Sequence, residues 1–382
     1  VFNMWLYGLF LATLMQITVS ESVVINYSAH NVNNKHSSGS SSSGISRSSS
    51  DNISNGSNMT CPDSTDIAPC VCYIDPEDQT LNMDCSKVTS NEELAKVFTA
   101  EFPYTDFKQL YAYGAWNLTV LGEGVFGPVT FSEIYIHMSG VRVIEEGALM
   151  GSMETLKSLD IHDCYLETFP FHILPDLTAM IHLDLFTNLL QLNTLPQLES
   201  TTLKYLHLGE NQITSVPVDA FQLLPAIEFI GLGNWWWSYV RLTEIQPGTF
   251  LNLKHLNEIE LLDEQISHIR AGTFVTGSGS LKKVWLGSSH VLHTVDVDAF
   301  EPVENMYISL GNNNLTDLPE EVWRPLLEVN STLNIWGNPF SCDCSLAWLI
   351  REPDFVRCTS YGVCSDGTHF EDLDPDMYDN CI

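Results

Sequence analysis

The chain has 382 residues, and its 48 acidic side chains against 16 basic ones give a formal net charge of −32 at pH 7. A surface this negative repels polyanions, which excludes nucleic acid as a partner and makes binding to an anionic membrane surface unfavourable. Hydrophobic residues make up 44% of the chain, which is enough to build a packed core.

The chain begins at Val1 with a short apolar segment, residues 4–19, which reads MWLYGLFLATLMQITV and is followed by the small residues Ser20 and Ser22. An apolar run of this length before small residues is typical of a signal peptide, and it is marginal for spanning a bilayer. We therefore expect residues 1–20 to be a removed signal peptide, with a membrane anchor as the alternative.

Residues 21–60 are rich in Ser, Gly and Asn and hold almost nothing that could enter a core, which predicts a flexible linker. Sequons for N-glycosylation, N-x-S/T, lie here and further along the chain, at Asn26, Asn52, Asn55, Asn58, Asn117, Asn314 and Asn330. Together with the leader, these sequons indicate a secreted, extracellular glycoprotein.

Cysteines gather at the two ends of the region that follows. The expected N-terminal cap, residues 61–106, contains Cys61, Cys70, Cys72 and Cys85, and the expected C-terminal cap, residues 338–382, contains Cys342, Cys344, Cys358, Cys364 and Cys381. Disulfides within each cluster would seal the open ends of a core. Zinc is the alternative, although the single residue inside Cys70-x-Cys72 and Cys342-x-Cys344 is a tighter spacing than structural zinc sites use.

Between the caps, residues 107–337 repeat one pattern. Its clearest copy is LKYLHLGENQITSVPVDAFQLL, residues 203–224, which has the L-x-x-L-x-L-x-x-N spacing of a leucine-rich repeat. The position of Leu206 recurs at intervals of 23 to 29 residues, at Leu110, Ile134, Leu159, Leu183, Ile230, Ile259, Val284, Ile308 and Leu333. This period predicts an α/β leucine-rich-repeat solenoid: a curved parallel sheet of about ten short strands on the concave face, with disulfide-rich caps at both ends.

Two further positions recur in the repeats. Five residues after the strand position stands a small polar residue, which we expect to hydrogen-bond the backbone of the neighbouring coil: Ser139, Cys164, Asn188, Asn211, Ser289, Asn313 and Asn338. Fifteen or sixteen residues after it stands a large apolar residue that should fill the back of the coil: Phe126, Leu149, Leu174, Phe221, Phe274, Phe300 and Trp323. Cys164 is therefore interpreted as a buried packing thiol rather than a reactive nucleophile.

The sequence GNPFSCDCSLAWL, residues 337–349, resembles the C-terminal cap of extracellular leucine-rich-repeat proteins, in which a Trp plugs the last coil. This resemblance implies the disulfides Cys342–Cys364 and Cys344–Cys381, and it leaves Cys358 over, which departs from the family pattern. The N-terminal cysteine cluster is similar to the matching N-terminal cap, which implies the disulfides Cys61–Cys72 and Cys70–Cys85.

A narrower resemblance comes from both ends of the chain. The segments CPDSTDIAPCVCYIDPEDQTLNMDC, residues 61–85, and DLDPDMYDNC, residues 372–381, with about ten repeats between them, resemble the group of the non-catalytic subunit of Oplophorus-luciferin 2-monooxygenase and its arthropod relatives. The resemblance implies a secreted protein that has no chemistry of its own and supports a separate catalytic subunit.

The strand side chains that face away from the core should line the concave side. There the sequence places aromatic and histidine candidates for partner binding: Tyr111, Tyr113, Tyr135, His137, His162, Phe186, His207 and Trp285. Exposed aromatics on a rigid sheet favour a protein partner, and a solvated face without a ligand is the alternative. Metal binding or pH sensing by the adjacent His137 and His162 is a further alternative, although we expect no metal.

The longest interval between strand positions has a visible cause. After Leu232 the sequence reads GNWWWSYVRL, an insertion of five residues that carries Trp235, Trp236, Trp237 and Tyr239. Insertions in solenoids loop out on one face, often the binding face. We interpret these aromatics as partner contacts, and the alternative is that they fold back over Phe229 and Phe186.

No H-E-x-x-H, G-x-S-x-G or P-loop motif is present, so we expect no enzyme activity and no cofactor. The sequence predicts a secreted scaffold that binds another extracellular protein, with no membrane anchor after the last cap. An adhesion or immune-recognition receptor ectodomain and an oxygenase acting on a small molecule are the alternatives.

Overall fold

A computed structural model of the chain describes residues 59–234 and 240–381. The expected signal peptide, most of the expected linker and the sequons at Asn26, Asn52, Asn55 and Asn58 lie outside the described residues. So do Trp235, Trp236, Trp237 and Tyr239.

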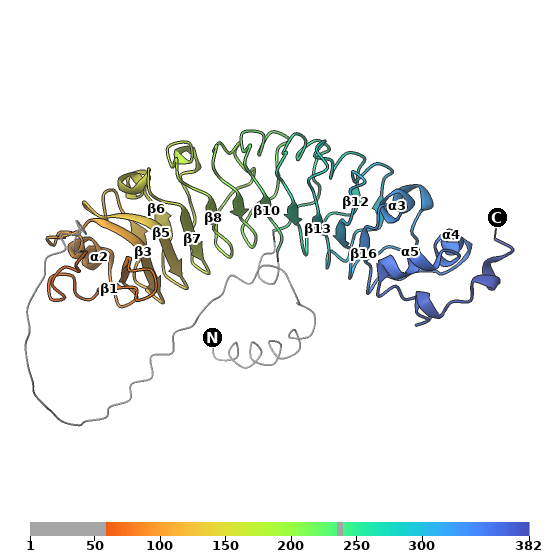
Figure 1. Cartoon of the computed structure of the whole chain (residues 1–382), viewed down its shortest axis with the longest axis horizontal. Coiled ribbons are helices and arrows are strands. Elements are labelled where there is room, and N and C mark those ends of the chain that lie inside the picture. Colours follow the sequence, from red (N-terminus) through yellow and green to blue (C-terminus); the bar gives the residue numbers. More distant parts are fainter. Residues whose placement is uncertain (1–58, 235–239, 382) are drawn as a thin grey trace, which may run out of the picture. The chain divides into compact units, whose positions relative to one another are not determined.

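A sheet of 13 strands runs through the described part of the chain. Its strands, in order, are β1 (Val71–Ile74), β2 (Leu81–Asp84), β3 (Asp106–Tyr113), β5 (Thr130–His137), β7 (Ser158–His162), β8 (His182–Asp184), β9 (Tyr205–His207), β10 (Phe229–Gly231), β11 (Glu258–Glu260), β13 (Lys283–Trp285), β15 (Tyr307–Ser309), β16 (Thr332–Asn334) and β17 (Thr359–Ser360). β1 and β2 are antiparallel, and every other neighbouring pair is parallel. The strands lie on the inner side of an arc of coils (Figure 1), which confirms the predicted leucine-rich-repeat solenoid.

The register of the sheet follows the sequence period. Leu110 pairs with Ile134, and the pairing continues from coil to coil until Ile308 meets Leu333. All ten strand positions read from the sequence are therefore in one register, and each of these residues is at most 1% exposed. A one-residue slip would turn this apolar column to the solvent, so burial fixes the register.

The first two repeat strands are longer than the short strands that the pattern predicts. β3 and β5 each have eight residues, whereas β8, β9, β10, β11, β13, β15 and β16 each have three. Their extra length brings Phe107 beside Phe131, and both rings are buried with Phe98 and Phe126 in one cluster. The buried pair of Phe107 and Phe131 therefore extends the β3–β5 pairing towards the N-terminal ends of both strands. The leucine spacing alone does not predict this extension.

The outer side of the coils holds little regular structure. Its elements are the paired strands β4 (Val120–Leu121) with β6 (Val143–Ile144) and β12 (His268–Ile269) with β14 (Thr294–Val295), the 3-10 turns η1 (Glu146–Ala148), η2 (Met150–Ser152) and η3 (Phe171–Ile173), and the helix α3 (Glu320–Leu327). Behind them the rings of Phe221, Phe250, Phe274, Phe300 and Trp323 form a continuous column with centroids 5.1 to 6.1 Å apart. The large apolar residues predicted at this position are all buried.

The small polar position also behaves as predicted. Asn188, Asn211, Asn313 and Asn338 are buried, and each side-chain amide donates to carbonyls of its own coil and of the preceding one. Cys164 replaces the amide in its repeat, where its sulfur lies 3.4 Å from both the Ser139 amide nitrogen and the Ile136 carbonyl. Burial raises the pKa of the Cys164 thiol to about 11, so this sulfur is a packing group rather than a nucleophile.

Cysteine pairs close both ends of the core. The N-terminal end carries α2 (Asn91–Val97), whose first turn is capped by the Ser90 side chain, and the C-terminal end carries η4 (Cys344–Leu346), α4 (Ala347–Ile350), α5 (Pro353–Cys358), η5 (Phe370–Asp372) and η6 (Pro375–Tyr378). The disulfides are Cys61–Cys72, Cys70–Cys85, Cys342–Cys364 and Cys344–Cys381, the same pairs that the family resemblance implies, and Cys358 is unpaired. The paired cysteines of both clusters therefore form disulfides rather than zinc sites. Trp348 packs on the last coil, and its indole N–H donates to the Leu318 carbonyl.

Removing Cys70–Cys85, one of the two N-terminal disulfides, should destabilise the coils next to it. Cys70 and Cys85 are both buried and close a loop of sequence separation 15, so the Cys70→Ala, Cys85→Ala double variant is expected to lose about 3 kcal/mol of unfolding free energy. The unpaired Cys358→Ala should change stability by less than about 0.5 kcal/mol. Urea unfolding without reductant measures both, and equal effects in the two variants would contradict the prediction.

A carboxylic acid occupies the small polar position of one repeat. Glu264 is 1% exposed, accepts hydrogen bonds from the side-chain amide of Asn234 (2.7 Å) and from the backbone N–H of Leu242, and thereby joins the two sides of the five-residue insertion. Burial raises the pKa of Glu264 from 4.5 to about 8. The buried Oδ1 of Asn234 has no hydrogen-bond partner among the described residues, so a flipped Asn234 amide would accept a hydrogen bond from the hydroxyl of neutral Glu264.

This buried acid predicts a pH dependence of stability. Between about pH 4.5 and about pH 8 the native state holds a proton that the unfolded chain releases, so stability falls across that window with a slope of up to about 1.4 kcal/mol per pH unit. Glu264→Gln should remove this slope, because an amide donates to Asn234 Oδ1 without ionising. Glu228→Gln removes only the 2.7 Å pair with Lys204 from a side chain that is 46% exposed, so it is the control, and unfolding curves across this pH range test both variants.

Candidate functional site: the concave face

Aromatic rings stack along one column of the concave face. His182, Tyr205 and Phe229 occupy the first position of β8, β9 and β10, and the registers place them side by side. The ring centroids of His182 and Tyr205 lie 4.2 Å apart and those of Tyr205 and Phe229 lie 4.4 Å apart, with interplanar angles of 9° and 7°. Burial lowers the pKa of His182, which keeps its ring neutral within the stack. The result is an aromatic strip across three coils, made of three parallel rings stacked face to face.

His207 lies beside this strip and supports it. Its ring stacks on Phe186 with centroids 4.5 Å apart and meets Phe229 edge-on at 5.8 Å. A Cβ at Gly231 would lie 2.4 Å from the His207 ring, so glycine is required where the imidazole passes the next strand. Although burial opposes it, the nearby Asp184 carboxylate, 3.4 Å from Nδ1, raises the pKa of His207.

A His-Asp-His cluster lies further towards the N-terminus, on β5 and β7. His137 and His162 stack with ring centroids 3.8 Å apart, and the Asp160 carboxylate faces a ring nitrogen of each. Asp160 Oδ1 is 2.7 Å from His162 Nδ1 and 3.2 Å from His137 Nε2, although the latter contact lacks hydrogen-bond alignment. Burial opposes ionisation of this acid, but the two ring nitrogens outweigh it and hold the pKa of Asp160 far below its usual value. The same contact raises the pKa of His162 against the effect of its own burial.

Two of the candidates are less exposed than the sequence suggests. His137 is 6% exposed and His207 is 9% exposed, whereas the alternation of strand side chains places both on the open face. Tyr111 and Tyr135 cover His137 edge-on, each with its centroid 6.0 Å away, and Phe186 covers His207. Neighbouring coils are so closely spaced that large side chains in adjacent repeats shield one another.

Tyr135 and Trp285 are each held in place by a carboxylate, which comes from the same strand for Tyr135 and from the preceding strand β11 for Trp285. The Tyr135 hydroxyl donates to Glu133 (3.3 Å), and burial raises the pKa of Tyr135 to about 12. The Trp285 indole N–H donates to Glu258 (2.8 Å), and its ring lies 5.2 Å from that of Tyr307. The acidic side chains of the concave face therefore orient aromatic rings that remain partly exposed.

A group of exposed aromatic side chains lies at the ends of the first repeat strands and in the loops that follow them. Tyr113 is 49% exposed and donates to the Met138 sulfur, while Trp116 is 53% and Tyr165 is 42% exposed. The Trp116 and Tyr165 rings lie 6.5 Å apart, and Arg142 sits over Tyr165. Tyr113 is the only one of these that the sequence selected, because loop aromatics do not follow the strand period.

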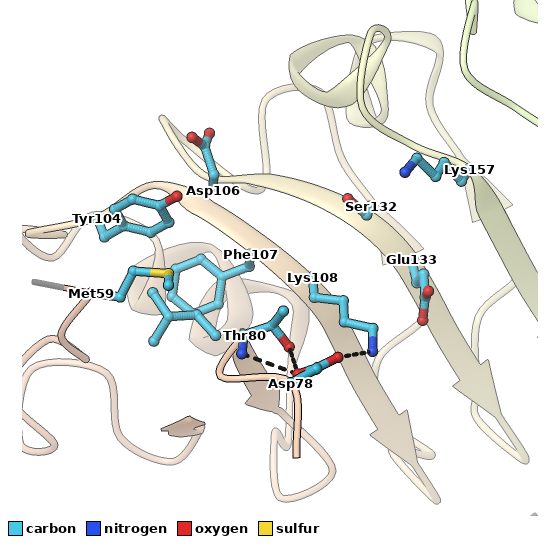
Figure 2. A pocket seen from close by; sticks show the side chains of 11 residues that line it. Met59, Asp78, Thr80, Tyr104, Asp106, Phe107, Lys108, Ser132, Glu133 and Lys157 are labelled. Carbon is cyan, nitrogen blue, oxygen red and sulfur yellow. Dashed lines mark hydrogen bonds and ion pairs between the residues drawn. The ribbon is translucent and has the colours of Figure 1, made fainter. Parts of the chain in front are cut away.

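A shallow cavity of about 370 Å³ lies at the starting ends of β2, β3 and β5, away from the aromatic strip. Figure 2 shows Lys108 reaching Asp78, which also accepts from Thr80, with Tyr104 and Met59 on the opposite wall. The Lys108 Nζ to Asp78 Oδ2 distance is 2.5 Å, so these two charges neutralise each other. The concave strip, whose rings are held by stacking, remains the better candidate.

The sequence selected eight described concave residues as partner contacts, and the structure places all of them on the sheet or at its ends. It brings His137 beside His162 and Phe186 beside His207, whereas Trp285 lies several coils away from both pairs. The sequence did not select Asp160, His182, Tyr205 or Phe229. Aromatic residues at the same strand position in three successive repeats were the available signal for the last three.

Comparison with known proteins places the chain among extracellular leucine-rich-repeat proteins. It is 32% identical over 323 residues to the non-catalytic subunit of Oplophorus-luciferin 2-monooxygenase from Oplophorus gracilirostris, covering 84% of this chain and 88% of that protein. It is 26% identical over 210 residues to lumican from Gallus gallus, covering 52% of this chain and 57% of lumican. No protein-family model matches the sequence.

The fold has counterparts among solved structures. A chain in the octameric complex of Latrophilin 3, Unc5D and FLRT2 superposes with a TM-score of 0.62 at 19% identity, covering 81% of this chain and 99% of that chain. This similarity concerns the fold alone. The four disulfides mark the chain as an extracellular protein. Within residues 59–234 and 240–381, no helix combines the length and apolar character needed to cross a bilayer.

Proposed function

Because this chain belongs to the leucine-rich-repeat family of the non-catalytic subunit of Oplophorus-luciferin 2-monooxygenase, we propose that it is a secreted accessory subunit. It has no chemistry of its own and binds a separate extracellular protein, which in the relative's case the name implies to be a catalytic subunit. The concave sheet is the binding surface. Recognition is by shape and stacking, with no bond made or broken.

The observation that carries this proposal is the strip formed by His182, Tyr205 and Phe229. The three rings are nearly parallel and stacked face to face, are fixed by these contacts with one another and remain half-buried rather than covered. A rigid aromatic surface loses little conformational entropy when a partner packs on it, which is why aromatic residues dominate binding energy at protein interfaces.

Charge supports the same surface and describes the partner. The strip is flanked by acidic side chains of its own and the adjacent strands, namely Asp160, Asp184, Glu258 and Glu260. The chain as a whole carries a net charge of −32. A partner that presents an apolar or aromatic group ringed by Lys and Arg would be steered to this face, and its association rate would fall with added salt.

The proposal includes the organisation of the whole chain: a signal peptide at 1–20, a linker at 21–60, caps at 61–106 and 338–382, and repeats at 107–337. Asn117, Asn314 and Asn330 are exposed and lie outside the strands, so glycans at these sequons leave the concave strip accessible. Trp235, Trp236, Trp237 and Tyr239 remain proposed contacts from the sequence alone.

Cross-linking mass spectrometry of the protein in its native secretion tests this function. We expect cross-links to one dominant partner from lysines that border the sheet, such as Lys157, Lys204 and Lys283, and none from Lys254 in the outer turns. Cross-links confined to the outer turns would overturn the assignment of the concave face. Turnover of a luciferin by the purified chain alone would overturn the accessory role.

A further inference from the structure

From the cluster on β5 and β7 we infer a metal site that the proposed function does not require: His137, Asp160 and His162 bind a divalent transition-metal ion, with Zn²⁺ the expected occupant. One ligand atom from each of the three residues lies within 4.8 Å of the other two. Two imidazoles and one carboxylate are a donor set that suits Zn²⁺, while the hard ions Ca²⁺ and Mg²⁺ prefer oxygen ligands alone.

The distances from Asp160 to the two imidazole nitrogens are close to what a zinc ion requires. Ligands at 2.0 to 2.1 Å in a tetrahedral site lie roughly 3.3 Å from one another. Asp160 Oδ1 is 3.2 Å from His137 Nε2, and its 2.7 Å separation from His162 Nδ1 opens with a small rotation of a ring that is 23% exposed. The sheet pairs His137 with His162 and Asp160 lies two residues away, so the backbone already fixes all three positions.

A buried nitrogen without an aligned hydrogen bond points to a missing ligand in this cluster. The His137 side chain is 8% exposed, and its Nε2 has no hydrogen-bond partner among the described residues although it faces Asp160. Buried polar atoms in native proteins are nearly always paired, because an unpaired one loses its bonds to water without replacement. A metal ion between His137 Nε2 and Asp160 Oδ1 would satisfy this nitrogen.

The surroundings favour a cation and leave one side of it open. Asp184 lies beside Asp160 on the next strand, and Asp163 Oδ2 is 3.8 Å from His162 Nε2, where it can hold the outer ring nitrogen. Three protein ligands leave a fourth position for water, and His162, the most exposed of the three, marks the side from which water reaches it.

Isothermal titration calorimetry on the untagged full chain tests the site after chelator treatment, with ZnCl₂ as the probe at about pH 8, where protons compete least with zinc. We expect one strong binding event per chain. Asp160→Asn and His162→Gln should each weaken it by more than about 10-fold, which is the lower bound for losing even an outer-shell partner of a metal. His182→Gln, a half-buried histidine of the same face outside the cluster, is the matched control and should bind as the wild type does.

Two further measurements distinguish a specific zinc site from general metal binding by acidic side chains. Excess Ca²⁺ should not displace Zn²⁺, because only a non-selective acidic surface would exchange the two ions freely. Co²⁺ added in place of Zn²⁺ should give visible absorption bands of a low-coordinate site in the wild type and lose them in His162→Gln, whose unfolding curve reports that it is folded. Zinc affinity equal in wild type, Asp160→Asn and His162→Gln, or displacement by Ca²⁺, would overturn the inference.

Discussion

Replacing Asn211 with alanine is expected to lower the free energy of unfolding by about 4 kcal/mol. Its Oδ1 accepts the buried backbone N–H of Leu190 at 3.0 Å, and its Nδ2 donates to the carbonyls of Leu185 at 2.8 Å and Leu208 at 3.0 Å. Alanine would leave the Leu190 N–H and the Leu208 carbonyl buried without these partners. Each such group costs about 1 to 3 kcal/mol, so the loss exceeds that of an ordinary surface substitution.

Urea unfolding followed by circular dichroism measures this change, and Asn193→Ala is the matched control. Asn193 is an exposed asparagine of the neighbouring coil, so its loss should alter stability by less than about 0.5 kcal/mol. A drop of less than about 1 kcal/mol for Asn211→Ala would mean that water reaches the backbone groups of this coil, which contradicts a closely stacked solenoid.

The Tyr205→Ala, Phe229→Ala double variant should lose about 3 to 4 kcal/mol of binding free energy for the protein partner. This loss corresponds to a dissociation constant that is about 100 to 1000 times larger. The two rings form the centre of the strip, and their removal leaves His182 without its stacked neighbour. Both side chains lie on the concave surface above the apolar column, so the variant keeps the buried strand positions that hold the coils together. Biolayer interferometry with the partner identified by cross-linking gives the dissociation constants.

Leu223→Ala, Leu251→Ala is the control for this prediction. Both leucines are 41% exposed and follow the buried Phe221 and Phe250 in the outer turns, so the pair matches the strip in coil and in hydrophobic character. Partner binding by this variant should equal that of the wild type. If the outer-turn variant loses affinity and the strip variant does not, the binding surface is the convex side.

The sequence by itself determined the frame of this protein. Period and residue type placed Leu110 through Leu333 in one strand register, because a coil of nearly constant length stacks equivalent residues on each other. The same logic predicted the buried Asn amides and the Phe column, since backbone turns need a polar partner at a fixed point and each coil has one space to fill. Residue spacing therefore fixed the position of each side chain within its own coil.

Only the tertiary structure decided what happens between coils on the concave face. The burial of His137 and His207, the strip of His182, Tyr205 and Phe229, and the carboxylate of Asp160 between two imidazoles all depend on rotamers and on coil spacing. The same holds for Glu264, which stands where asparagine is usual and bonds to both sides of an insertion. A one-dimensional repeat specifies which residues are neighbours, but distances and angles between their side chains arise from packing in three dimensions.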